Sequence, residues 1–139
     1  MNICVYGASS NTIDNSYIEA NLELGRLIAM QGHTVVFGGG ACGMMGAVAR
    51  GARSEGGDVL GISPAFFKVD GSLYDECTDF IYTETMRERK QLLEDRSDGF
   101  IISPGGVGTL DEFFEIFTLR QLSKHKKPIV IFNVNHYYD

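Results

Sequence analysis

Short apolar runs along the chain alternate with longer segments in which apolar residues recur every three or four positions. Apolar runs bounded by turn residues are typical of buried strands, and the longer spacing is typical of helices that bury one face. The pattern predicts strands at 2–6, 33–37, 58–62, 80–82, 99–102 and 128–133. It predicts helices at 16–31, 44–54, 85–96 and 109–123, with an irregular segment at 63–76.

The order of these elements determines the expected fold class. Strands that alternate with helices over short connections form a parallel sheet whose two faces are covered by the helices. We therefore expect one doubly wound, three-layer α/β/α domain over residues 1–139. Residues 135–139 look like the start of a helix after the last strand, so we also expect this domain to lack its C-terminal helices.

Three glycine-rich loops each follow a predicted strand and open a predicted helix. They are Gly7-Ala-Ser-Ser, Gly38-Gly-Gly-Ala-Cys-Gly and Pro104-Gly-Gly-Val-Gly. Right-handed crossovers place all three loops at the same edge of a parallel sheet. Ligands of open α/β sheets bind at this carboxyl edge, so the loops mark the expected site.

Composition narrows the classes of function. The chain has 139 residues and a net charge of −6, and without basic runs it is a poor match to nucleic acid or anionic membranes. We see no signal peptide, and no apolar run approaches the ~20 residues of a membrane span. Cys4, Cys42 and Cys77 are too widely spaced for a disulfide framework or a zinc site. We therefore expect a protein of the reducing cytoplasm.

The segment Pro104-Gly-Gly-Val-Gly-Thr-Leu-Asp-Glu112 has the chemistry of an anion site. Glycines let the backbone approach a bulky anion, and the following helix directs unpaired N–H groups and its positive dipole end toward it. The loop lacks the lysine of a nucleoside-triphosphate P-loop, so a monophosphate without magnesium fits better than ATP. A glycine turn that serves only the strand-to-helix geometry is the alternative.

Two charged groups have both a functional and a structural interpretation. Glu112 is a candidate catalytic carboxylate, but Thr109-x-x-Glu112 also matches a capping box, in which the glutamate bonds to its own helix. Arg87, Arg89 and Lys90 put positive charge into the first turn of a helix, where the dipole disfavours it. A bound anion explains this pattern, and a solvated face neutralised by neighbouring glutamates explains it equally well.

The other candidates give weaker signals. The stretch Gly38-Gly-Gly-Ala-Cys-Gly-Met-Met-Gly46 suits either the base and sugar of a nucleotide or close packing between sheet and helix. Ser9 and Ser10 can donate to a phosphate or cap the first helix. Cys42 has no evident histidine partner, so a cysteine nucleophile is disfavoured.

Together these motifs resemble the Lonely Guy family, the cytokinin riboside 5′-monophosphate phosphoribohydrolases, from Asn2 onward. The resemblance implies a Rossmann-like fold, a homodimer, and no metal or organic cofactor. It implies a hydrolase of cytokinin biosynthesis. Such an N-glycosidase cleaves the N-glycosidic bond of purine, cytokinin-type nucleoside 5′-monophosphates and releases the free base and ribose 5-phosphate.

Matched motif by motif, the resemblance assigns the catalytic roles to Arg89 and Glu112. The substrate-binding residues that it implies are Ser9, Gly39, Gly40, Gly43, Met86, Lys90, Gly105, Gly106, Val107, Gly108, Thr109 and Thr118. In the expected reaction, Glu112 stabilises positive charge on the ribose and orients water. Arg89 neutralises charge on the base or the phosphate, because a guanidinium is a poor proton donor.

One departure from the family and two alternatives bear on this interpretation. Arg87 stands where the family pattern has histidine, which leaves the preferred base open. Ser123-Lys-His-Lys126 matches a pattern around the lysine of some pyridoxal-phosphate decarboxylases, but a solvated loop explains it, and we expect no lysine decarboxylase. The alternative function is a non-catalytic carrier of a nucleotide or phosphorylated cofactor on the same fold. The presence of both Arg89 and Glu112 argues for the hydrolase.

Overall fold

The computed structural model describes residues 1–69 and 71–139, in which strands and helices alternate. The strands are β1 (Asn2–Tyr6), β2 (Thr34–Phe37), β3 (Val59–Pro64), β4 (Asp79–Thr83), β5 (Gly99–Ile102) and β6 (Ile129–Ile131). The helices are α1 (Asn15–Met30), α2 (Gly43–Ser54), α3 (Phe66–Val69), α4 (Met86–Asp95) and α5 (Val107–Gln121), followed by the 3-10 turn η1 (Val134–His136).

The predicted strands and the four predicted helices are confirmed, with small shifts at their ends. The segment predicted to be irregular, 63–76, differs more. Its first residues belong to β3, it contains the short helix α3, and its residue 70 lies outside the described residues. The helix start expected at 135–139 is a single 3-10 turn, because Asn135 and His136 have φ values of 53° and 57° that an α-helix cannot continue.

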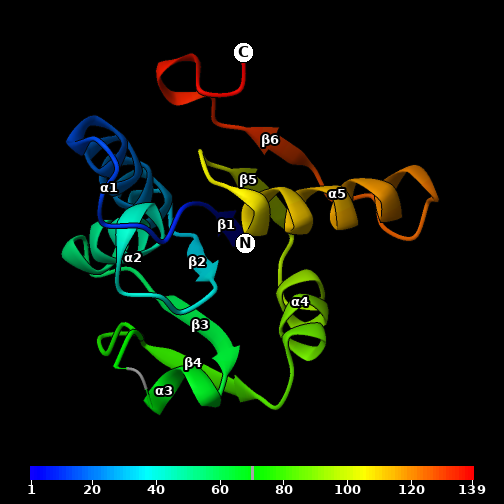
Figure 1. Cartoon of the computed structure of the whole chain (residues 1–139), viewed down its shortest axis with the longest axis horizontal. Helices are drawn as coiled ribbons and strands as arrows, with labels where there is room; N and C mark the ends of the chain where they lie inside the picture. Colours follow the sequence, from blue (N-terminus) through cyan, green and yellow to red (C-terminus); the bar gives the residue numbers. More distant parts are fainter. Residues whose placement is uncertain (70) are drawn as a thin grey trace.

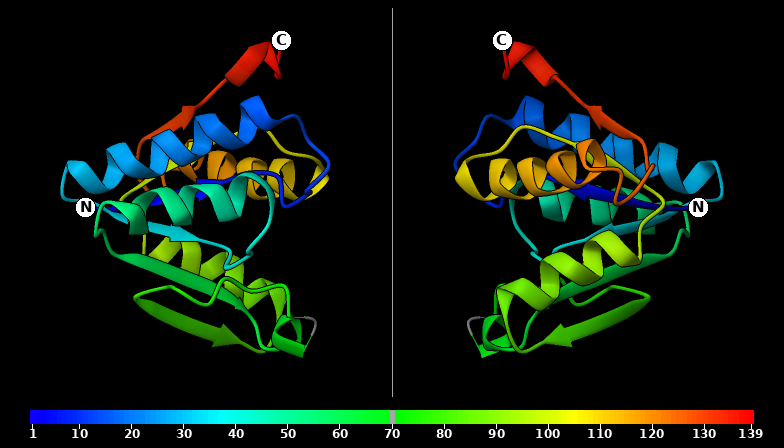
Figure 2. Two further views of the ribbon diagram at one scale, coloured as in Figure 1. Left: turned by 90° about the vertical axis from the view of Figure 1, so that its left-hand side faces the viewer. Right: turned by 90° about the vertical axis from the view of Figure 1, so that its right-hand side faces the viewer.

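All neighbouring strands are parallel, in the order β4-β3-β2-β1-β5-β6. Helices α1 and α2 cover one face of the sheet, and α4 and α5 cover the other (Figures 1 and 2). This arrangement confirms the expected doubly wound, three-layer fold. The chain progresses from β1 outward to β4 and then continues on the other side of β1 with β5. The carboxyl ends of β1 and β5 therefore form a topological switch point, where open α/β sheets bind their ligands.

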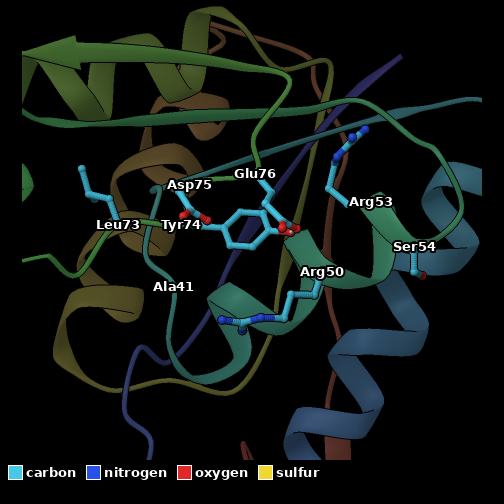
Figure 3. A pocket seen from close by; sticks show the side chains of 8 residues that line it. All are labelled: Ala41, Arg50, Arg53, Ser54, Leu73, Tyr74, Asp75 and Glu76. Atoms are coloured by element: carbon cyan, nitrogen blue, oxygen red, sulfur yellow. Dashed lines mark hydrogen bonds between the residues drawn. The ribbon is translucent and has the colours of Figure 1, made fainter.

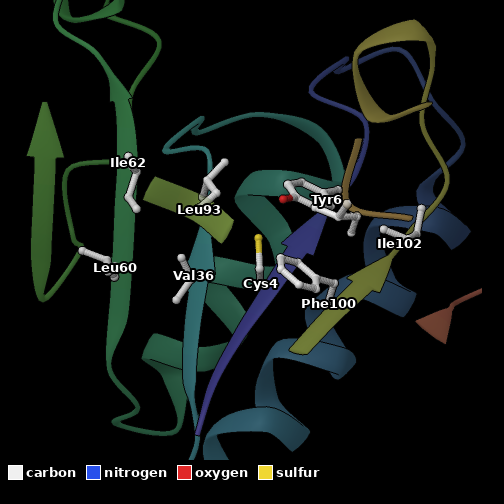
Figure 4. Close-up of a cluster of buried hydrophobic side chains, with 9 residues drawn as sticks. Cys4, Tyr6, Val36, Leu60, Ile62, Leu93, Phe100 and Ile102 are labelled. Atoms are coloured by element: carbon white, nitrogen blue, oxygen red, sulfur yellow. The ribbon is translucent and has the colours of Figure 1, made fainter. Parts of the chain in front are cut away.

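The core has two halves because successive side chains of a strand point to opposite faces of the sheet. In β1, Cys4 and Tyr6 point toward α4 and α5 and pack in one cluster with Leu93 and Ile116 (Figure 4). Val5 points to the opposite face, into a second cluster with side chains of α1 and α2. This packing on both faces fixes the strand ends from which the glycine loops start.

Candidate active site

A cavity of about 530 Å³ lies at the carboxyl edge of the sheet. The loops after β1 and β2 line it, together with the segment around α3 and the first turns of α4 and α5. Residues of the predicted site that line this cavity are Ser9, Gly40, Met86, Arg89, Lys90, Gly106, Gly108, Thr109 and Glu112. The fold therefore brings together motifs that lie far apart in the sequence.

The other predicted binding residues lie outside the cavity wall. They are Gly39, Gly43, Gly105, Val107 and Thr118. The three glycines are chain neighbours of lining residues, so their backbone adjoins the cavity. Val107 is 85% exposed in the first turn of α5. Thr118 is exposed near the carboxyl-terminal end of α5, away from the first turn that contributes Thr109.

Arg89 is a buried cation that backbone carbonyls hold at the cavity. The Thr85 side chain caps α4 by accepting a hydrogen bond from the Glu88 N–H (3.1 Å), and Arg89 follows in the first turn. Its Nη2 donates to the Gly38 carbonyl (3.0 Å) and its Nε donates to the Ile62 carbonyl (3.2 Å). Only 7% of the residue is exposed. The carboxyl ends of β2 and β3 thus fix the guanidinium in one orientation.

The charge of Arg89 has no carboxylate partner in the described part of the chain. None of the salt bridges among residues 1–69 and 71–139 includes it. A buried charge is stable when it is paired, and neutral carbonyls compensate it less than an anion does. An anionic ligand in the cavity would therefore complete the electrostatic environment of the guanidinium.

Glu112 lines the same cavity and does not cap its helix. Helix α5 begins at Val107, two residues before the predicted start, and Gly106 is its N-cap. Thr109 lies inside the first turn, so the capping-box interpretation of Thr109 and Glu112 is wrong. Burial raises the pKa of Glu112 to about 7, although the nearby charge of Arg89 opposes this shift. Carboxyl groups that titrate near neutral pH are typical of catalytic sites.

The amino-terminal end of α5 has the features of an anion site. No side chain of residues 1–69 and 71–139 caps this helix, and its first turn is closed by a bond from the Leu110 N–H to the Gly106 carbonyl (3.0 Å). The first N–H groups and the positive end of the helix dipole are therefore available to a ligand. Thr109, which is only 4% exposed, adds a hydroxyl group. Lys90 adds a second cation, and its hydrogen bond to Asp111 (3.1 Å) raises the pKa of its ammonium group.

Sequence reasoning missed two residues on the apolar side of the cavity. Phe67 of α3 and Leu73 line it, and both come from the segment predicted to be irregular. Leu73 pairs with Gly40 in an antiparallel bridge, which holds this segment beside the second glycine loop. Met45 of α2 also lines the wall, and its sulfur accepts a hydrogen bond from the Gly40 N–H (3.3 Å). Met45 belongs to the stretch Gly38–Gly46, which the sequence predicted to suit the base and sugar of a nucleotide. No sequence motif indicated Phe67 or Leu73, because the bridge joins segments that carry no shared local pattern.

A second cavity, of about 510 Å³, shares Leu73 with the first. Figure 3 shows the side chains that line it. Its charged lining residues are Arg50, Arg53, Asp75 and Glu76. The Arg50 guanidinium lies over the Tyr74 ring, 5.5 Å from the ring centroid. Because cations and carboxylates are equal in number, this cavity has no surplus charge that would select a charged ligand.

Several other sequence features lie apart from the candidate chemistry. Cys42 lines the first cavity, but the described lining residues include no histidine to activate it. Arg87 and Lys126 are exposed and lie outside the cavity wall. Within residues 1–69 and 71–139, no group of three or more His, Cys, Asp or Glu side chains is placed to hold a metal ion. None of the helices in those residues has the length and hydrophobicity needed to cross a membrane.

Comparison with known sequences gives consistent matches along the chain. Residues 45–139 match a family model described as possible lysine decarboxylase. The chain is 44% identical to a cytokinin riboside 5′-monophosphate phosphoribohydrolase of Mycobacterium tuberculosis, over 99% of this chain and 73% of the relative. It is 39% identical to a probable cytokinin riboside 5′-monophosphate phosphoribohydrolase of Oryza sativa, over 99% of this chain and 60% of the relative. The chain is thus shorter than both relatives.

A solved structure with the same fold belongs to a protein that is described as a cofactor-binding protein and not as a phosphoribohydrolase. The molybdenum cofactor binding protein from Rippkaea orientalis has a TM-score of 0.76 and 27% sequence identity, over 94% of this chain and 74% of that chain. This 27% identity is lower than the 44% and 39% identities to the two phosphoribohydrolases.

Proposed function

The chain belongs to the cytokinin riboside 5′-monophosphate phosphoribohydrolase family, and from this premise we propose that it hydrolyses a purine nucleoside 5′-monophosphate to the free base and ribose 5-phosphate. The observation that carries the proposal is the pair of Arg89 and Glu112 in one cavity. Arg89 is a buried cation that no described carboxylate pairs, and Glu112 has a pKa of about 7. The family model is described as a possible lysine decarboxylase, but the curated relatives are named phosphoribohydrolases.

Glu112 acts on the ribose and on the attacking water. When the bond between C1′ and the base nitrogen breaks, its electron pair stays on the base and positive charge develops on the sugar. A carboxylate stabilises that charge, as in other glycosidic hydrolyses. The water oxygen bonds to C1′, one water proton passes through Glu112 to the base, and the other remains on the new hydroxyl. A pKa of about 7 lets the same group accept and release this proton at neutral pH.

Arg89 supplies charge and not a proton, because a guanidinium is a poor proton donor. The carbonyls of Gly38 and Ile62 occupy Nη2 and Nε, so further N–H groups of the guanidinium remain for the substrate. In the low-dielectric cavity, this cation neutralises negative charge on the departing base or on the phosphate. The amino-terminal end of α5, with Thr109, binds the 5′-phosphate. The apolar wall of Met45, Phe67 and Leu73 accommodates the flat base.

A carrier of a phosphorylated cofactor is the second candidate. The similarity to the molybdenum cofactor binding protein favours it, because that protein has the same fold. A carrier and a hydrolase both need the anion site at α5, but only the hydrolase needs a carboxyl group with a raised pKa beside a buried cation. The environment of Arg89 and Glu112 therefore supports the hydrolase more strongly.

A panel of nucleotides distinguishes the two candidates. The protein is incubated with AMP, an N6-substituted AMP and adenosine, and free base is followed by chromatography. We expect base release from the monophosphates and none from adenosine, because adenosine lacks the group that α5 binds. Equal rates on AMP and adenosine would rule out the phosphate anchor. Binding of AMP without release of base would favour the carrier.

The active form is proposed to be a cytoplasmic homodimer. On α5, Phe113 and Ile116 pack against the core, whereas Phe114 and Phe117 are 58% and 41% exposed. Large apolar side chains exposed together on one helix are typical of protein interfaces. A second copy of the chain would cover them.

Free cysteines at 4, 42 and 77 agree with a reducing compartment.

A further inference from the structure

Asn21 is a fully buried polar residue that neither the sequence motifs nor the proposed chemistry explain. It lies on α1 with 0% exposure. Its Nδ2 donates to the Met44 carbonyl (2.9 Å), and its Oδ1 accepts a hydrogen bond from the Ser103 hydroxyl (2.7 Å). Ser103 is also 0% exposed. Both bonds therefore lie in the interior, where loss of either partner leaves a polar group unpaired.

The two partners of Asn21 belong to two different loops of the cavity. Ser103 directly precedes the phosphate loop, residues 104–109, and Met44 lies in the first turn of α2 after the second glycine loop. Gly7, at the start of the first glycine loop, lies between them. A Cβ atom on Gly7 would lie 3.3 Å from the Ser103 Cβ, 3.4 Å from the Met44 Cβ and 3.7 Å from the Asn21 Nδ2. All three loops thus converge on the Asn21 amide.

Backbone hydrogen bonds connect the same loops by a second route. The Ala8 N–H donates to the Pro104 carbonyl (2.9 Å), and the Met45 N–H donates to the Ala8 carbonyl (3.2 Å). This route passes through the first glycine loop, whose next residues are exposed. Asn21 connects the phosphate loop to α2 through the side chain of a long helix instead. It therefore adds a buried side-chain connection between these two parts of the cavity wall to the one that the backbone makes.

We propose that Asn21 is a positioning residue that holds the phosphate loop against the amino-terminal end of α2 and thereby sets the affinity for the 5′-phosphate group of the substrate. The proposal rests on the proposed function, because it assigns the phosphate to this loop. Asn21 does not line the cavity and acts through Ser103. Its removal frees the loop that binds phosphate, and it also frees the Met44 carbonyl beside Met45 of the apolar wall. Ser103→Ala keeps the bond to Met44 and therefore alters the phosphate loop alone.

The test compares Asn21→Ala and Ser103→Ala with Asn15→Ala, a control that removes an exposed amide from the same helix. The measurements are KM and kcat for AMP and the inhibition constants of ribose 5-phosphate and adenine. Loss of a buried hydrogen bond should raise KM for AMP and the constant for ribose 5-phosphate about tenfold in both variants. In Ser103→Ala, which keeps the bond from Asn21 to the Met44 carbonyl, we expect kcat and the adenine constant to change by less than about twofold. Asn15→Ala should match the wild type.

The outcomes separate a positioning role from a purely structural one. A lower melting temperature with an unchanged ribose 5-phosphate constant would overturn the proposal. We expect the double variant to lose no more affinity than either single variant, because the two side chains act as one unit, and additive losses would contradict it. If Asn21→Ala does not fold, Ser103→Ala decides the question, because it removes a single hydroxyl.

The same variants distinguish failure of this inference from failure of the proposed function. If the wild type releases no base from AMP, the proposed function fails. Calorimetric titration with ribose 5-phosphate then decides the role of Asn21: weaker binding by both variants supports it, and equal binding overturns it. Absence of ribose 5-phosphate binding to the wild type would overturn both.

Discussion

Substituting Gly38 with alanine should displace the Arg89 guanidinium with a single methyl group. A Cβ atom on Gly38 would lie 1.7 Å from the Arg89 Nη2 and 2.8 Å from its Cζ, so the guanidinium must move. Gly38 does not have a positive φ, and an alanine backbone is therefore unstrained there. The movement breaks the Nη2 bond to the Gly38 carbonyl. A hydrogen bond from a charged donor contributes about 1.5–3 kcal/mol, so kcat/KM for AMP should fall about 10- to 150-fold.

The assay is release of adenine from AMP, and the matched control is the same substitution in an Arg89→Ala background. There the methyl group has no guanidinium to displace, so Gly38→Ala should add less than about a threefold loss. Circular dichroism establishes that each variant is folded at the assay temperature. Full activity of Gly38→Ala, or equal losses in the two backgrounds, would refute the placement of Arg89 against this carbonyl.

Three further predictions follow from the charges and exposed surfaces. The pKa of Glu112 is about 7 because of burial, so kcat/KM should rise with pH up to about 7 and then level off, and an enzyme equally active at pH 5 and 8 would contradict this. The pKa of Glu112 rises from its usual 4.5 to about 7 in the folded protein, so the free energy of unfolding falls as pH rises from 4.5 to 7. Urea titration should therefore show that Glu112→Gln is more stable than wild type at pH 8 by about 2–3 kcal/mol. An unchanged or lower stability of Glu112→Gln would argue against a buried carboxylate at this position. Phe114→Glu should sediment as a monomer where wild type is a dimer, whereas Leu27→Glu at an exposed position of α1 should remain a dimer. A monomeric wild type would contradict the proposed interface.

The sheet could be predicted because buried parallel strands leave a strong local signal. The predicted strands 2–6 and 99–102 coincide with β1, which Gly7 follows, and with β5, which lies between Asp98 and Ser103. The four-residue helix α3 could not be predicted, because it is too short to show a helical period and lies between Pro64 and Gly71. The turn at the end of the chain depends on positive φ values that no apolar pattern encodes.

The site was predictable in part, and the limits have identifiable causes. The position of Arg89 follows from the Thr85 cap one turn before it, which the sequence indicates. Its carbonyl partners depend on the lateral order of β2 and β3, which no local motif specifies. The role of Glu112 was ambiguous because Thr109 resembles an N-cap, whereas the structure starts the helix at Val107. Phe67 and Leu73 of the apolar wall were missed because their segment has no periodic pattern, and among the described residues an isolated bridge to Gly40 holds it at the cavity.

The central claim is that Arg89 and Glu112 form a site that hydrolyses a nucleoside 5′-monophosphate. The most direct test is quantification of adenine and ribose 5-phosphate after incubation of AMP with wild type and with Glu112→Gln. We predict that wild type forms the two products in equal amounts, and that Glu112→Gln still binds AMP but forms neither at a comparable rate. Product formation by Glu112→Gln at the wild-type rate, or the absence of adenine with wild type, would contradict the claim.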